Sequence, residues 1–295
     1  MGTVVTIQVI GHDANGVERA EREAGVARAA EWFTHITAQC SRFDPASELS
    51  RLTTQVAVAV PVSTLLFESL KVALAVAADT DGAFDPTVGR RLEERGFDTN
   101  YQTGTRSRST IDPTCRASWR DIMLDDEAHT VTLTRPMVLD LGAVVKGLAI
   151  DAAAMELAPF ANFAIDAGGD VYVAGSSASG DLWRVGIRHP RNPDELIDSL
   201  NVSDCAVCTS GDYFRRGNPD TNDHHILDAT TGDTALKCAS VTVIAPSAMV
   251  ADALATSAFI LGPTAGIALL ERHGVEGLII TPSLERHQTS VMVGR

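Results

Sequence analysis

The chain has 295 residues, a hydrophobic content of 45% and a formal net charge of −14. This composition argues against a disordered protein, and the negative charge argues against nonspecific binding to nucleic acid or to anionic membranes. The five cysteines are not the even set of a disulfide framework, and every apolar run is too short to span a bilayer. With no basic and apolar leader at its start, the sequence predicts a cytoplasmic protein or a trimmed form of an exported one.

In chain order, the predicted elements are those of an α+β protein. Residues 17–40 have the spacing of a long amphipathic helix, and a second helix follows Ser63 and ends at Gly82. Residues 121–134 predict a hairpin with an acidic turn. Strands are expected at 5–10, 163–168, 171–175, 183–189, 240–245 and 277–281, and polar loops at 100–118, 176–181 and 215–223. The last loop lies between two motifs, and we interpret it as a segment that could move over a site.

The segment TDGAFDPTVG at 80–89 follows the second helix and permits two interpretations. Phe84 and Asp85 precede Pro86, and a residue before proline favours an extended backbone. One interpretation is a helix end and a turn with no further role. The other is a loop that presents Phe84 as a flat apolar surface and Asp85 as a hydrogen-bond acceptor.

The segment LDLGAVVKGLAID at 139–151 combines an apolar run, a glycine and a lysine. Asp140 ends a run, PMVLDL, that predicts a strand, and Gly142 permits a tight turn before a helix that follows Lys146. The start of such a helix offers free N–H groups and a positive dipole to an anion. The spacing of a Walker A loop is absent. An ordinary strand-to-helix turn with a solvated lysine explains the segment equally well.

Polar residues are crowded between 209 and 259, in TSGDYF, HHILDATTG and ADALATSAF. Asp252 and Thr256 are four residues apart in a predicted helix and therefore share one face. A carboxylate and a hydroxyl are hard oxygen ligands of the kind that Mg²⁺ accepts, with phosphate and water completing its shell. From this helix alone the simpler interpretation is favoured, namely an Asp that stabilises the helix dipole and a Thr bonded to a carbonyl.

Two other patterns predict structure rather than chemistry. Cys205 and Cys208 lie in a strand-like segment, where their side chains point to opposite faces, so we expect buried thiols and not a zinc or redox pair. Gly168 and Gly169 lack the spacing of a dinucleotide fingerprint and predict a close turn between strands.

Taken in order, these segments resemble the ApbE family of flavin transferases, which move FMN from FAD onto a threonine or serine of a target protein. The similarity runs nearly end to end, through MGTVVTIQV, SRFDPASELSRL, TDGAFDPTVG, LDLGAVVKG, NFAIDAGGDVYVAG, VCTSGDYF, HHILDATTG and VTVIAPSAMVADALATSAFILG. The resemblance implies one ApbE-like domain over residues 1–295, with a T-fold-like arrangement of mixed sheets and packed helices. It places the active site in a cleft between two intimately joined lobes.

The resemblance also implies a role for each matching residue. Asp252, Thr256 and the backbone carbonyl of Ala143 would bind Mg²⁺, and His225 would lie beside the reacting phosphate. The FAD site would comprise Met1, Phe43, Ala83, Phe84, Asp85, Asp140, Lys146 and Leu227 or its neighbour Ile226. The partners would be FAD and an acceptor flavoprotein that carries the target Thr or Ser.

Three positions depart from the family pattern. Phe43 stands where a tyrosine is common, Ala229 stands where a proline usually follows the HHIxD aspartate, and Ala255 stands where some members carry a third acidic group. The first change removes a phenolic hydrogen bond but keeps stacking, and the third leaves the metal site with fewer charges.

In the expected reaction, an acceptor hydroxyl attacks the phosphorus next to the flavin, and AMP leaves. His225 is the predicted base, since an imidazole accepts a proton near pH 7, whereas we expect His224 to be a surface or supporting histidine. Mg²⁺ would neutralise charge on the phosphates, and Lys146 would add a positive group or bond the flavin ring. Two alternatives stay open: an FAD pyrophosphatase that gives FMN and AMP, and a protein that only binds FAD. The sequence identifies neither the acceptor protein nor the oligomeric state.

Overall fold

A computed structural model describes residues 2–11, 16–100, 103–112, 114–214 and 223–292. In these residues the helices are α1 (Gly16–Cys40), α2 (Glu48–Thr53), α3 (Thr64–Asp79), α4 (Gly89–Glu94), α5 (Gly142–Leu157), α6 (Ala248–Leu261) and α7 (Pro263–Arg272). The strands are β1 (Val5–Val9), β2 (Ala59–Pro61), β3 (Ile122–Asp125), β4 (Thr130–Leu133), β5 (Phe163–Ala167), β6 (Asp170–Ala174), β7 (Trp183–Arg188), β8 (Leu196–Val202), β9 (Cys205–Gly211), β10 (Ser240–Ala245), β11 (Glu276–Ile280) and β12 (Arg286–Gln288). Among the described helices, none combines the length and the apolar character that a bilayer crossing requires.

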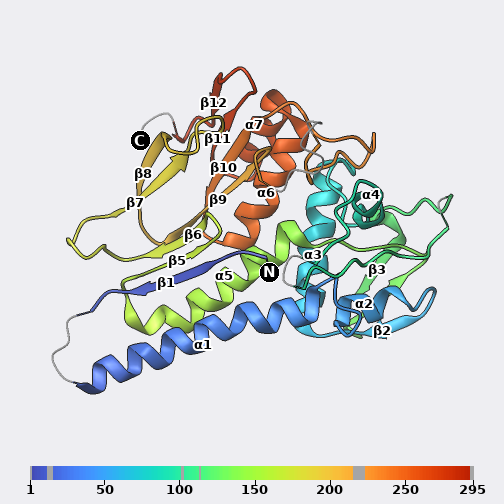
Figure 1. Cartoon of the computed structure of the whole chain (residues 1–295), viewed down its shortest axis with the longest axis horizontal. Helices are drawn as coiled ribbons and strands as arrows, with labels where there is room; N and C mark the ends of the chain where they lie inside the picture. The colour runs from blue at the N-terminus through green and yellow to red at the C-terminus, as the bar shows by residue number, and fades with distance from the viewer. Residues whose placement is uncertain (1, 12–15, 101–102, 113, 215–222, 293–295) are drawn as a thin grey trace.

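A seven-stranded sheet forms the centre of the described structure, in the order β1-β5-β6-β9-β10-β11-β12, and every neighbouring pair is antiparallel. Helices α1 and α5 run side by side along one face of this sheet (Figure 1), and α6 packs against β9 and β10. Strand β10, SVTVIA, is buried along its whole length, which explains its nearly continuous run of apolar and small residues.

Alternation along the strands divides the apolar side chains between two clusters. On β10, Val243 points into the large core under the helices, whereas Ile244 points to the other face. The β7–β8 hairpin supplies Ile187 to the smaller cluster on that second face. Cys205 and Cys208 on β9 also divide between the two clusters, as their spacing predicts.

A second lobe contains the β2-β4-β3 sheet with α2, α3 and α4 (Figure 1). Helix α3 begins after the predicted cap Ser63, whose side chain accepts a backbone N–H of the first turn. The helix ends in a Schellman motif, in which the N–H groups of Asp81 and Gly82 donate to the carbonyls of Ala78 and Ala77. One continuous core includes residues of α3, α5 and α6, so the two lobes share their interior.

The run PMVLDL is not a strand, although its alternation predicts one. Met137 and Leu139 are buried at alternate positions, yet the only bridge of this described segment joins Val138 to Val88. The alternation reflects an extended segment that is buried without a neighbouring strand to pair with, and α5 begins directly after it. The sequence also leaves β2, β8 and β12 unpredicted, because these strands are short or rich in polar residues.

Candidate active site

A cavity of ≈ 300 Å³ gathers nearly all of the predicted site residues from the two lobes. The predicted residues that line it are Phe43, Phe84, Asp85, Asp140, Ala143, Lys146, His225, Ile226, Leu227, Asp252 and Thr256. Ala83 is buried beside Phe84, and its carbonyl accepts the Ala229 N–H at 3.0 Å. Met1 lies outside the described residues, and so does the 215–222 part of the loop that the sequence predicts to be mobile.

Helices α5 and α6, which we call the helix wall, form one side of the cavity. A Cβ on Gly147 would lie 2.4 Å from Ala248 O, so only glycine lets the two helices approach this closely. The Asp151 carboxylate of α5 accepts hydrogen bonds from Ser247 Oγ and from the N–H groups of Ala248 and Met249. It satisfies N–H groups at the start of α6, and burial raises its pKa. These contacts set which face α6 presents to the cavity.

Lys146 Nζ lies between two buried carboxylates in the helix wall and the adjacent sheet. It forms an ion pair with Asp170, which is 1% exposed, and lies 3.4 Å from Asp252 Oδ2. The other oxygen of Asp170 accepts the Thr209 N–H at 2.9 Å. Lys146 is therefore not the solvated lysine of an ordinary turn, since it compensates two negative charges that are shielded from water.

Asp252 and Thr256 lie on one face of α6, as their spacing predicts, and both line the cavity. Asp252 lies beyond the first turn of the helix, and Thr256 Oγ1 contacts Ser210 Oγ at 3.0 Å. This arrangement contradicts the simpler interpretation of a dipole-stabilising Asp and a Thr bonded back to its own helix.

Three residues with oxygen donors line this part of the cavity: Asp252, Thr256 and Ala143, whose carbonyl belongs to the first turn of α5. Such donors suit Mg²⁺, which keeps several waters and binds through few protein ligands and substrate phosphates. Among the described residues, no group of three or more His, Cys, Asp or Glu side chains could hold a metal ion. The donor set therefore fits a magnesium ion shared with a ligand and does not fit a closed protein cage.

Another part of the lining is aromatic and includes Phe43, Phe84, Phe97 and Phe214. Phe84 is 6% exposed and also belongs to the core. The two carboxylate oxygens of Asp85 accept backbone N–H groups at 2.8 and 3.0 Å, and burial raises the pKa of this carboxyl. Asp85 therefore anchors its own loop and holds Phe84 in place, in addition to lining the cavity.

Arg42, which the sequence does not single out, joins the aromatic lining to Asp140. Its guanidinium carbon lies 4.1 Å from the ring centroid of Phe43. Its Nε donates to Asp140 Oδ2 at 2.5 Å, and its Nη2 donates to Phe97 O at 2.6 Å. Asp140 Oδ1 accepts the Gly142 N–H at 2.8 Å, so one carboxylate connects the arginine to the start of α5.

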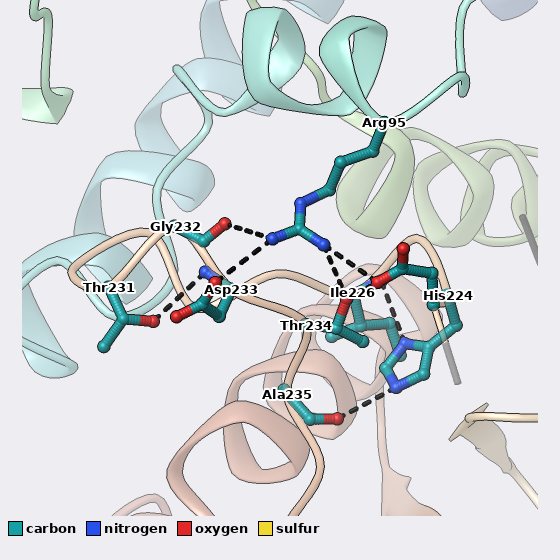
Figure 2. A network of polar contacts seen from close by, with 9 residues as sticks. Arg95, His224, Ile226, Thr231, Gly232, Asp233, Thr234 and Ala235 are labelled. Carbon is teal, nitrogen blue, oxygen red and sulfur yellow. Dashed lines mark hydrogen bonds and ion pairs between the residues drawn. The ribbon is translucent and has the colours of Figure 1, made fainter. Parts of the chain in front are cut away.

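Residues 223–235, which we call the loop wall, form another side of the cavity, and Figure 2 shows the polar contacts that hold them. Arg95, at the end of α4, donates to Asp223 Oδ1, Thr234 Oγ1 and Gly232 O. A backbone hydrogen bond also joins the two ends of the segment, because the Ala235 N–H donates to Ile226 O. A single arginine from the other lobe thus contacts both ends of the loop wall.

The adjacent histidines of the loop wall have different surroundings. His224 is 1% exposed, its Nε2 lies 2.9 Å from Ala235 O, and its Nδ1 accepts the Ile226 N–H at 3.3 Å (Figure 2). Because a carbonyl only accepts, Nε2 carries the proton in this contact. His225 lines the cavity, with its ring centroid 6.4 Å from that of Phe97. His224 is therefore a buried supporting residue and not a surface histidine.

The sequence and the fold were compared with those of known proteins. The sequence matches the model of the ApbE family over residues 1–279. The chain belongs to the ApbE family. It is 34% identical over 267 residues to a Treponema pallidum protein named FAD:protein FMN transferase, a match that covers 80% of this chain and 71% of that protein. A Vibrio cholerae protein of the same name is 31% identical over 261 residues, which cover 83% of this chain and 75% of that protein.

Solved ApbE structures share the fold. The ApbE protein from Thermotoga maritima matches with a TM-score of 0.84 and 33% identity, over 99% of this chain and 95% of that chain. The flavin transferase ApbE from V. cholerae matches with a TM-score of 0.81 and 26% identity, over 99% and 96% of the two chains. These matches confirm the predicted ApbE-like α+β fold.

Four residues support this ApbE-family site but were not predicted from the sequence: Arg42, Arg95, Asp151 and Asp170. Asp151 and Asp170 each occur in a mostly apolar stretch, LAIDAAAMEL and GGDVYVAG. A carboxylate in such a stretch requires a partner when it is buried. An acidic residue within an apolar run could therefore have indicated both positions from the sequence. The partners of Arg95 lie up to 139 residues away, so no local pattern indicates them.

Proposed function

We propose that this ApbE-family chain is a Mg²⁺-dependent FAD:protein FMN transferase, acting as one domain over its length. It would move FMN from FAD to a Thr or Ser hydroxyl of an acceptor flavoprotein and release AMP. The observation that carries the proposal is one cavity that combines oxygen donors for a divalent cation, aromatic side chains for a flat ring, and a histidine. Similarity to proteins named FAD:protein FMN transferase supports the same reaction.

Charge in the cavity supports the need for a divalent cation. The carboxylates of Asp85, Asp140 and Asp252 line it, whereas the cationic side chains of its described lining are those of Arg42 and Lys146. Anionic FAD would therefore meet negative charge unless a further cation accompanied it. Asp252, Thr256 and the Ala143 carbonyl would hold that cation. When bound, Mg²⁺ would neutralise charge on the phosphates and orient them.

The aromatic lining would bind the flavin half of FAD. Phe43 and Phe84 would contact the isoalloxazine ring, Leu227 would lie against the nucleotide, and Asp140 would contact it near the start of α5. Ala83 would contribute through its backbone, and Met1 is proposed on the family resemblance. Lys146 contacts Asp252, which favours a role at the phosphates over a bond to the flavin ring.

The proposed chemistry moves the FMN group, which is a phosphoryl group that carries riboflavin. The acceptor oxygen forms a bond to the phosphorus on the flavin side, the bond from that phosphorus to the bridging oxygen breaks, and AMP leaves with the bridging oxygen. His225 would accept the proton of the attacking hydroxyl, because a neutral imidazole is a competent base near pH 7. Its place in the cavity lining, on the loop wall and near Phe97, leaves it accessible to the ligand.

Incubation with FAD, Mg²⁺ and a candidate acceptor tests the proposal. AMP together with an FMN-labelled acceptor, detected by mass spectrometry, is the expected result. AMP with free FMN would instead identify a pyrophosphatase, and FAD binding without AMP would identify a flavin-binding protein. Chelation of the metal should stop AMP release, and added Mg²⁺ should restore it.

A further inference from the structure

The guanidinium of Arg42 has a hydrogen-bond donor that the described protein does not use. The side chain is 7% exposed, and its Nε and Nη2 donate to Asp140 and Phe97. Its Nη1 is buried from solvent and has no hydrogen-bond partner among the described residues. Folded proteins rarely leave a buried donor of a charged group unpaired, because its desolvation is then uncompensated.

The cavity offers a place for the missing acceptor, since Arg42 lines it together with Phe43, Phe97 and Asp140. The guanidinium plane is fixed by its two partners and by the ring of Phe43, 4.1 Å away. The remaining N–H groups of the guanidinium, two of which are on Nη1, are therefore held in one orientation. A preorganised donor of this kind loses little entropy when a ligand binds.

The charge of Arg42 indicates what kind of acceptor fits. Asp140 already neutralises the guanidinium at 2.5 Å, so the remaining donor does not require an anion. The aromatic neighbours favour a flat ring, whereas the residues suited to phosphate, Lys146 and Thr256, belong to the helix wall. A neutral carbonyl oxygen on an aromatic ring system satisfies both conditions.

We propose that Arg42 is a ligand-binding residue whose Nη1 donates a hydrogen bond to a ring carbonyl oxygen of the flavin. This inference rests on the proposed function, because it takes FAD as the ligand of the cavity. In this inference Arg42 helps the site to recognise the flavin half of FAD, and other residues bind the phosphates.

Riboflavin and ADP with Mg²⁺ are suitable probes, because each carries one half of FAD. Arg42→Gln removes the charged fork, and Arg42→Lys keeps the charge but not the fork. Both variants should bind riboflavin about 10–100-fold more weakly by titration, the range expected for a hydrogen bond from a charged donor. Their affinity for ADP should stay unchanged.

Arg90→Gln is a matched control. Arg90 also pairs with one carboxylate, Glu94, and one backbone carbonyl, that of Ile111, but it does not line the cavity. This variant should lose thermal stability in the ligand-free form while keeping both affinities. The shift in melting temperature that riboflavin produces gives a second measurement that does not depend on turnover.

Equal losses for riboflavin and ADP in the Arg42 variants would overturn the inference, since they would place Arg42 at a phosphate or in a general structural role. Unchanged riboflavin affinity would overturn it as well. These results leave the proposed function intact when wild type still binds FAD and releases AMP. If the wild-type protein binds no FAD, both the proposed function and this inference are wrong.

Discussion

The helix wall and the loop wall present side chains to the same cavity but are held by different means. In the helix wall, Gly147 permits close packing, Asp151 fixes the start of α6, and Lys146 compensates buried carboxylates. In the loop wall, backbone bonds and Arg95 hold a segment that has little regular structure. The helix wall can therefore lose a cavity-facing group without destabilising the fold. In the loop wall, the contacts of Arg95 and His224 stabilise the segment that positions the cavity-facing His225.

The largest effect is expected when the helix wall loses its cavity carboxylate. Asp252→Ala should lower the rate of AMP release by about 10³-fold or more, because it removes an anionic metal ligand. The fold should persist, since Lys146 keeps its ion pair with Asp170. The matched control is Ser257→Ala. Ser257 is also on α6 but does not line the cavity, and its hydroxyl donates to Ala253 O. Turnover of the Asp252 variant close to wild type at limiting Mg²⁺ would refute the metal assignment.

The two histidines of the loop wall are adjacent in sequence and provide a sharper comparison. His225→Ala should slow transfer by about 10²–10⁴-fold, the range for a positioned base, with an unchanged melting temperature. His224→Ala should lower the free energy of unfolding by about 2–4 kcal/mol, because it deletes a buried ring and its hydrogen bonds. Its rate per folded molecule should fall far less. Stopped-flow or discontinuous AMP assays and thermal melts give both readings, and the reverse pattern would exchange the two roles.

Arg95→Gln tests whether the loop wall depends on its contact with the other lobe. We expect the free energy of unfolding to fall by about 1–3 kcal/mol, because the variant breaks bonds to Asp223, Thr234 and Gly232. The rate should fall less than in His225→Ala. Arg120→Gln, which breaks the exposed pair with Asp81, is the control and should change neither quantity measurably. Hydrogen exchange of residues 223–235 that stays as slow as in wild type would show that other contacts hold the loop.

The smallest effect concerns pH and the support of the helix wall. Burial raises the pKa of Asp151, so the folded protein keeps this proton at pH values where the unfolded chain has lost it. The stability linked to this proton is fully present below the unfolded pKa of about 3.9 and is lost as pH rises through the folded pKa. Asp151→Asn removes the titration, so the stability of wild type relative to this variant should decline over that window. Urea unfolding across the pH range measures it, and a pH-independent difference would contradict the assignment.

Local patterns predict the helix wall well and the loop wall poorly. The spacing of Asp252 and Thr256 depends only on helix periodicity, and the cap at Ser63 depends only on neighbouring residues. By contrast, the burial of His224 depends on Phe259 and Ala235, which close around it only in the folded chain. The predicted strand at PMVLDL was wrong for the same reason, because burial of an extended run does not ensure a neighbouring strand.

The sequence by itself determined the α+β class, the order of most strands, the face shared by Asp252 and Thr256, and the resemblance to the ApbE family. These properties follow from short-range periodicity and from motifs that remain readable along the chain. Only the tertiary structure decided which charged side chains form ion pairs: Lys146 with Asp170, Arg42 with Asp140, and Arg95 with Asp223. Such pairs join residues 24, 98 and 128 positions apart, and they form because a carboxylate or guanidinium that folding removes from water must find a partner wherever packing places one.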